Sequence, residues 1–80
     1  MIMIDVLIPP LDESFDLEID ETITLKDFVN KLTDIVENVR NVRFRCKEFG
    51  LFSFTKGEFI KEGESFELQG IRNGERLVLV

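Results

Sequence analysis

The sequence predicts an α+β fold in which a mixed sheet of four to five strands packs on one long helix, at about residues 24–39. Runs of β-branched and aromatic residues near both ends of the chain are typical of strands. Between them, apolar residues recur at spacings of three and four, as on one face of a helix. Glycine and proline separate the runs, as expected at turns.

The first two predicted strands form a hairpin. Residues 2–8 are apolar and largely β-branched, which predicts a strand buried on both faces or nearly so. A pair of prolines ends this strand, because proline has no N–H to donate to a β-ladder. Phe15, Leu17 and Ile19 then alternate with acidic residues. This period of two predicts an antiparallel strand with one solvated face.

The helix has the clearest pattern. Thr24 suits the N-cap, Asp27 suits its capping-box partner, and Arg40 suits the negative end of the helix dipole. A single apolar stripe must cover something, so we expect the helix to lie on the sheet. The residues of the stripe are Leu25, Phe28, Val29, Leu32, Ile35, Val36 and Val39.

Shorter strands follow the helix. They are expected at residues 51–54, 59–60 and 77–80, with a short strand or an extended connection at 42–46. Asn73-Gly74 favours a tight turn before the last strand. Phe66 and Leu68 lie in an irregular stretch, where we expect both to point into the core.

Length and charge limit the organisation and the partners. The 80 residues suffice for one core, so we expect a single domain over residues 1–80. A net charge of -6 argues against nucleic acid, because neutralising phosphates needs a basic surface. No apolar run reaches the ~20 residues of a membrane span, and the N-terminus lacks the features of a signal peptide.

The residue types argue against catalysis. The chain has no histidine, which removes the usual partner of a catalytic serine or cysteine and a common metal ligand. No glycine-rich loop is followed by the lysine of a phosphate site. The carboxylates at positions 16, 18 and 20 share one strand face, which we interpret as solvated and not as a cation site. We therefore expect no enzyme activity, no catalytic or metal residue and no cofactor.

The single cysteine points to a compartment. Cys46 has no second cysteine to pair with, and small secreted domains usually carry several disulfides. A reducing, cytoplasmic location is therefore expected. We expect Cys46 to act as a small apolar side chain, buried or half-buried.

The order of hairpin, long helix, short strands, tight turn and final strand is that of the β-grasp fold. Phe15–Asp20 followed by Thr22–Leu25 resembles the second strand and helix start of ubiquitin. Thr55-Lys56-Gly57 and above all Gly70–Val80 more closely resemble small bacterial ubiquitin-like proteins of the YukD/EsaB type, which accompany type VII (WXG100) secretion systems. Residues 40–50 depart from ubiquitin, with a longer and more regular connection.

The resemblance implies a cytoplasmic protein-binding module, whose partner would be the cytosolic part of a secretion ATPase or a membrane component. Ubiquitin and the sulfur carriers act through a flexible C-terminal Gly-Gly, whereas this chain ends in Leu79-Val80, so conjugation is not expected. A generic β-grasp scaffold or adaptor in another bacterial pathway stays open. So does, with least support, a sulfur-carrier-like protein without its Gly-Gly tail. The sequence leaves the oligomeric state open.

Two surfaces are candidates for binding. The simpler register of residues 51–54 buries Phe52 and Phe54 in the core. The alternative turns Phe54 outward into an apolar protein-interaction surface, which would mark an interface. That surface would comprise Leu7, Leu11, Phe54, Val78 and Val80. A basic patch that could steer charged partners would comprise Arg40, Arg43, Arg45 and Lys47.

Overall fold

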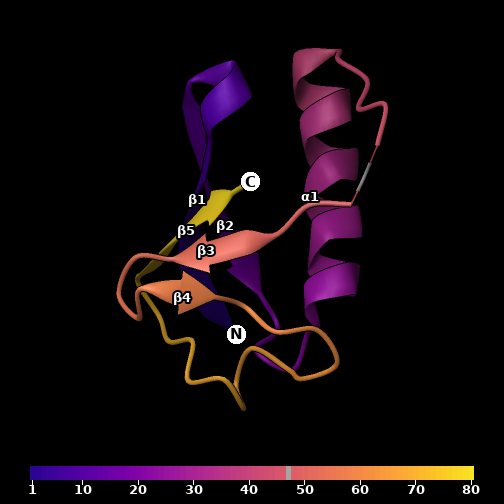
Figure 1. Ribbon diagram of the computed structural model, residues 1–80. Helices are drawn as coiled ribbons and strands as arrows, with labels where there is room; N and C mark the ends of the chain where they lie inside the picture. The colour runs from indigo at the N-terminus through magenta and orange to yellow at the C-terminus, as the bar shows by residue number, and fades with distance from the viewer. Residues whose placement is uncertain (47) are drawn as a thin grey trace.

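The computed structural model describes residues 1–46 and 48–80. Within them the strands form a five-stranded mixed sheet of order β2-β1-β5-β3-β4, in which β1 and β5 are parallel and the other neighbours antiparallel. Helix α1 runs along one face of this sheet (Figure 1). The elements are β1 (Ile2–Ile8), a 3₁₀ helix η1 (Pro9–Leu11), β2 (Glu13–Ile19), α1 (Leu25–Arg40), β3 (Leu51–Ser53), β4 (Glu58–Phe59) and β5 (Glu75–Leu79).

The hairpin of β1 and β2 forms as predicted, with Ile4 opposite Leu17 and Val6 opposite Phe15. The prediction that β1 is buried on both faces was wrong. Ile4 and Val6 are buried under the helix, whereas Met3, which points the other way, is 44% exposed. The physical reason is that α1 covers only one face of the sheet, so the alternation of side chains leaves every second residue outside.

Helix α1 lies within one residue of its predicted bounds. Thr24 occupies the N-cap position with extended backbone, but its side chain makes no capping hydrogen bond. Asn41 ends the helix in the left-handed conformation. The predicted stripe is buried except for Ile35, which is half-buried, and Val39, which is exposed at the last turn. Thr33 is also buried, and its hydroxyl is satisfied by donating to the carbonyl of Val29 at 2.9 Å.

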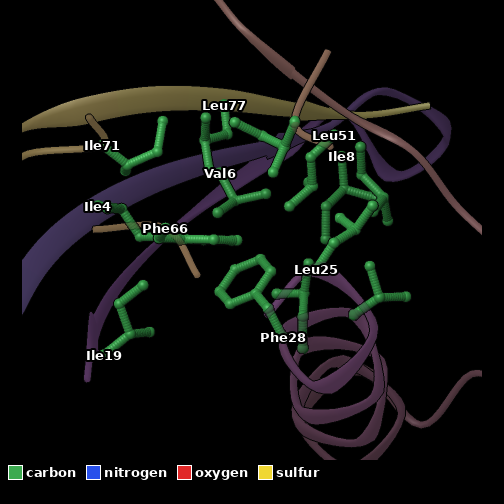
Figure 2. Close-up of a cluster of buried hydrophobic side chains, with 14 of the residues drawn as sticks. Ile4, Val6, Ile8, Ile19, Leu25, Phe28, Leu51, Phe66, Ile71 and Leu77 are labelled. Carbon is green, nitrogen blue, oxygen red and sulfur yellow. The ribbon is translucent and has the colours of Figure 1, made fainter. Parts of the chain in front are cut away.

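The core lies between α1 and the sheet. Figure 2 shows Leu25 and Phe28 pointing from the helix toward the strand residues Val6, Ile8 and Leu51. Phe66 closes the core from the loop before β5, with its ring centroid 5.2 Å from that of Phe28.

Leu68 does not point into the core as predicted. The chain turns back on itself here, since the N–H of Ile71 donates to the carbonyl of Phe66 at 3.0 Å. Phe66 and Ile71 are buried on the inside of this turn, and Leu68 on its outside is 78% exposed.

The connection from α1 to β3 contains no strand among its described residues. The N–H of Phe44 donates to the carboxylate of Glu37 at 2.8 Å, and the rings of Phe44 and Phe49 pack edge to face with centroids 5.4 Å apart. Cys46 is exposed, so the prediction of a buried or half-buried side chain was wrong. The two phenylalanines, and not the cysteine, anchor this connection on the core.

Candidate functional site

The sheet face that points away from α1, here called the outer face, carries a continuous apolar row. Leu7 of β1 lies opposite Val78 of β5, Val78 lies opposite Phe52 of β3, and Phe52 lies opposite Phe59 of β4. Side chains of residues paired across strands point to the same face of a sheet. The row therefore crosses four neighbouring strands without a polar side chain.

Three phenylalanine rings lie together at the β3–β4 end of this face. The ring centroid of Phe52 lies 5.2 Å from that of Phe59 and 6.3 Å from that of Phe54, both nearly perpendicular. This edge-to-face arrangement contributes about 0.5–1.5 kcal/mol per pair beyond the buried area. Phe54 is nevertheless 52% exposed and Phe59 is 58% exposed. The three rings thus hold each other in place while presenting apolar surface to solvent.

Gly50 extends the apolar area toward the C-terminal end of β5. Its N–H and carbonyl both bond to Val80, each at 3.0 Å. A Cβ on Gly50 would lie 3.6 Å from both the ring of Phe59 and a methyl of Val80. The two side chains therefore come together beside the bare glycine. We call the whole surface the outer-face patch: Leu7, Phe52, Phe54, Phe59, Val78 and Val80.

Four of the five predicted surface residues belong to this patch, namely Leu7, Phe54, Val78 and Val80. The fifth, Leu11, does not, because it lies in η1 and packs against the core. The simpler register for β3 was wrong: Ser53 points inward and is fully buried, so Phe52 and Phe54 point outward.

Sequence reasoning missed Phe52 and Phe59 as members of the patch. The signal was present at Ser53, a small polar residue between two phenylalanines. Its hydroxyl donates to the carboxylate of Glu75 at 2.6 Å and accepts the N–H of Lys56 at 3.1 Å. Since Glu75 is itself only 7% exposed, these bonds hold Ser53 inside the sheet. The sequence could not show that the carboxylate of Glu75 would be buried beside Ser53 as its hydrogen-bond acceptor.

Charged residues lie on the β2 side of the outer face. Asp5 and Asp16 are paired across β1 and β2, and Asp5 also pairs with Arg76, whose Nε lies 2.9 Å from the Asp5 carboxylate. Asp16 and Glu18 point outward from β2 and are exposed. The apolar patch is therefore bordered on this side by acidic groups.

The predicted basic patch is divided. Nε of Arg40 donates to both carboxylate oxygens of Glu13, at 2.9 and 2.7 Å, and its guanidinium lies 5.5 Å from the ring centroid of Phe15. The hydrogen bond with Arg40 lowers the pKa of Glu13, and the same bond raises the pKa of Arg40. Arg40 thus ties α1 to β2. Arg43 and Arg45 are exposed, and Lys47 lies outside the described residues.

Two hollows flank Phe49, which lines both. An open groove of about 880 Å³ runs between the N-terminal half of α1 and residues 48–50 and 60–62. An apolar pocket of about 270 Å³ lies between Pro9, Pro10, Phe44 and Val80. Among the described residues, no three histidine, cysteine, aspartate or glutamate side chains gather as metal ligands would. No helix in the described part of the chain has the length and apolar character needed to cross a bilayer.

Comparison with solved structures decides the fold. A de novo design based on ubiquitin superposes with a TM-score of 0.71 at 15% identity, over 99% of this chain and 85% of the design. The chain has the ubiquitin-like β-grasp fold. An Arabidopsis thaliana protein, whose structure combined evolutionary couplings with sparse NMR data, superposes with a TM-score of 0.70 at 24% identity, over 99% of this chain and 83% of that one.

At sequence identities this low, the structural similarity establishes the β-grasp fold alone. No protein-family model matches the sequence, and no curated protein matches it either. Within the β-grasp, the outer-face patch lies on the side of the sheet that α1 leaves uncovered. The fold therefore accounts for where the patch lies, and the phenylalanines of this chain account for its apolar character.

Proposed function

We propose that this chain is a non-catalytic protein-binding module that holds its partner through the outer-face patch. The observation that carries the proposal is the exposure of Phe54 and Phe59 beside Phe52. Single exposed apolar residues are ordinary, but a contiguous apolar patch on a folded chain marks an interaction site. Aromatic residues are also enriched among those that dominate binding energy.

We propose further that the module is a cytoplasmic, non-conjugated accessory component of a bacterial type VII (WXG100) secretion system. Support comes from the resemblance of Gly70–Val80 to the YukD/EsaB proteins. The partner would then be the cytosolic part of the secretion ATPase or of a membrane component. A scaffold role in another bacterial pathway is the alternative, and the identity of the captured partner separates the two.

Affinity capture from a host lysate tests both proposals. The wild-type chain is compared with a Phe54→Ser/Phe59→Ser double variant, which removes the two most exposed rings of the patch. The matched control is Val39→Ser, since Val39 is 56% exposed on the helix side of the molecule. We expect wild type and control to retain the same partner and the double variant to lose at least about 90% of it.

Two results would contradict these proposals. If the double variant captures as much partner as the wild type does, and circular dichroism shows that it is folded, the outer-face patch is not the binding surface. If capture depends on the patch but the captured proteins include no secretion component, in a host that expresses one, the type VII proposal is refuted. The scaffold role then stands.

A further inference from the structure

The outer-face patch has the dimensions of a helix footprint. The row Leu7–Val78–Phe52–Phe59 spans three strand spacings, or about 14 Å. On an α-helix, residues i, i+4 and i+8 share one face and cover about 12 Å. An apolar stripe of three such residues therefore matches the row in length.

An extended segment fits the patch less well. Adding a strand to the sheet beside the patch would use the free edge of β4, which consists of Glu58 and Phe59 alone. Two residues present too few backbone groups to hold a further strand, because such recognition depends on main-chain hydrogen bonds. A helix needs none of these groups, since its own backbone is satisfied internally.

The charge of the outer face indicates the charge of the helix. Among the described strand residues that point outward, Asp5, Asp16 and Glu18 are acidic and Arg76 is the one cation. Arg76 is engaged with Asp5. Asp16 and Glu18, here called the acidic strip, therefore leave the β2 side of the face negative. Lysine or arginine on a partner would be attracted there, and acidic residues repelled.

We propose that the outer-face patch binds an amphipathic helix of a partner protein, with an apolar stripe across the strands and basic residues over the acidic strip. The inference rests on the proposed function and adds the chemistry of the partner. A second copy of the chain is a poorer occupant, because it would bring another negative outer face and a net charge of -6 to the same surface.

Synthetic peptides of about 18 residues test the proposal. The first carries a leucine stripe with one tryptophan and lysines along its flank, and the second replaces every lysine with glutamate. The protein has no tryptophan or tyrosine, so the tryptophan emission of the peptide reports binding directly. We expect the lysine peptide to bind at least about tenfold more tightly than the glutamate peptide, with a difference that shrinks as salt rises.

Variants of the protein separate the patch from general charge attraction. We expect the variant Asp16→Lys/Glu18→Lys to bind the lysine peptide at least about fivefold more weakly than the wild type does. The control Glu48→Lys/Glu62→Lys makes the same change in net charge beside the groove along α1, and should leave binding within about twofold. Phe54→Ser/Phe59→Ser is expected to weaken binding at least about tenfold, and Val39→Ser to leave it unchanged.

The outcomes distinguish this inference from the function it rests on. Three results would overturn the proposal that the partner is a basic amphipathic helix. They are equal affinity of the two peptides, equal effects of the two charge reversals, and self-association of the protein in place of peptide binding. Backbone chemical-shift mapping on the wild type must place the peptide on the five strands, including β2 at the acidic strip, and shifts confined to α1 would also overturn the proposal. Capture of a partner from lysate that needs Phe54 and Phe59 would still leave the proposed function standing.

Discussion

At the scale of single residues, the pair of Ser53 and Glu75 sets which face of β3 is apolar. The Ser53 hydroxyl lies inside the sheet, where it donates to Glu75 and accepts from the backbone N–H of Lys56. Removing the hydroxyl would leave both groups without this partner. A buried polar group without a partner costs more than the bond itself contributes.

We expect Ser53→Ala to lower the free energy of unfolding by about 1–3 kcal/mol. The measurement is urea unfolding followed by far-UV circular dichroism. Ser14→Ala, an exposed serine on the outer face, is the control and should change stability by less than about 0.5 kcal/mol. Equal stability of the two variants would show that the Ser53 hydroxyl does not hold β3 in its register.

At the scale of elements, the turn before β5 joins two ends of the chain. The N–H of Met3 donates to the Oδ1 of Asn73 at 2.7 Å, and the N–H of Gly74 donates to the carbonyl of Met3, also at 2.7 Å. Gly74 has a φ of +88°, in the region that side chains disfavour. The tight turn predicted from Asn73-Gly74 is confirmed, and it aligns β5 for its parallel pairing with β1.

Gly74→Ala should therefore destabilise the protein by about 1–2 kcal/mol, although a Cβ there meets no atom within 4 Å. Gly50→Ala is the matched variant, because its backbone is not left-handed and its Cβ would make ordinary contacts with Phe59 and Val80. We expect it to change stability by less than about 0.5 kcal/mol. Thermal unfolding of both variants provides the comparison, and a larger loss in Gly50→Ala would refute the explanation.

At the scale of the whole molecule, ion pairs and hydrogen bonds engage three carboxyl groups in and just after β2. The pKa of Glu13 is lowered because Arg40 donates a hydrogen bond to it, and that of Asp20 because the backbone N–H and hydroxyl of Thr22 donate to it. The pKa of Glu21 is lowered chiefly by a hydrogen bond from the N-terminal ammonium group. All three carboxyl groups therefore favour their charged form in the folded state.

Stability should consequently fall in acid. A carboxyl group whose folded pKa is lowered stabilises the fold above its unfolded pKa, near 4, and loses this effect as the pH drops through the folded value. We expect Arg40→Gln to be less stable than wild type at about pH 7, with a difference that narrows below about pH 4. Urea midpoints across this range provide the measurement, and Arg43→Gln is the exposed control. A difference that stays constant with pH would refute the role of Glu13.

Local patterns predicted most of the architecture. The stripe from Leu25 to Val36 and the alternation of Phe15, Leu17 and Ile19 are periodic, so each fixes its own element and buried face. The exceptions lie where the pattern is short. Cys46 and Leu68 occur in irregular segments, where no period says which side chain points inward.

The sequence by itself determined an α+β fold with one helix, a hairpin and a tight turn at Asn73-Gly74. Its composition, which has no histidine, argued against the usual catalytic and metal sites. The sequence left two registers open for residues 51–54. Only the register that turns Phe54 outward placed this side chain on one surface with Leu7, Val78 and Val80. The tertiary structure decided between them, because a three-residue strand can bury either face and the choice depended on Glu75, 22 residues away, as partner of Ser53. That long-range contact, which no local pattern encodes, turned Phe52 and Phe54 outward and made the β3 part of the outer face apolar.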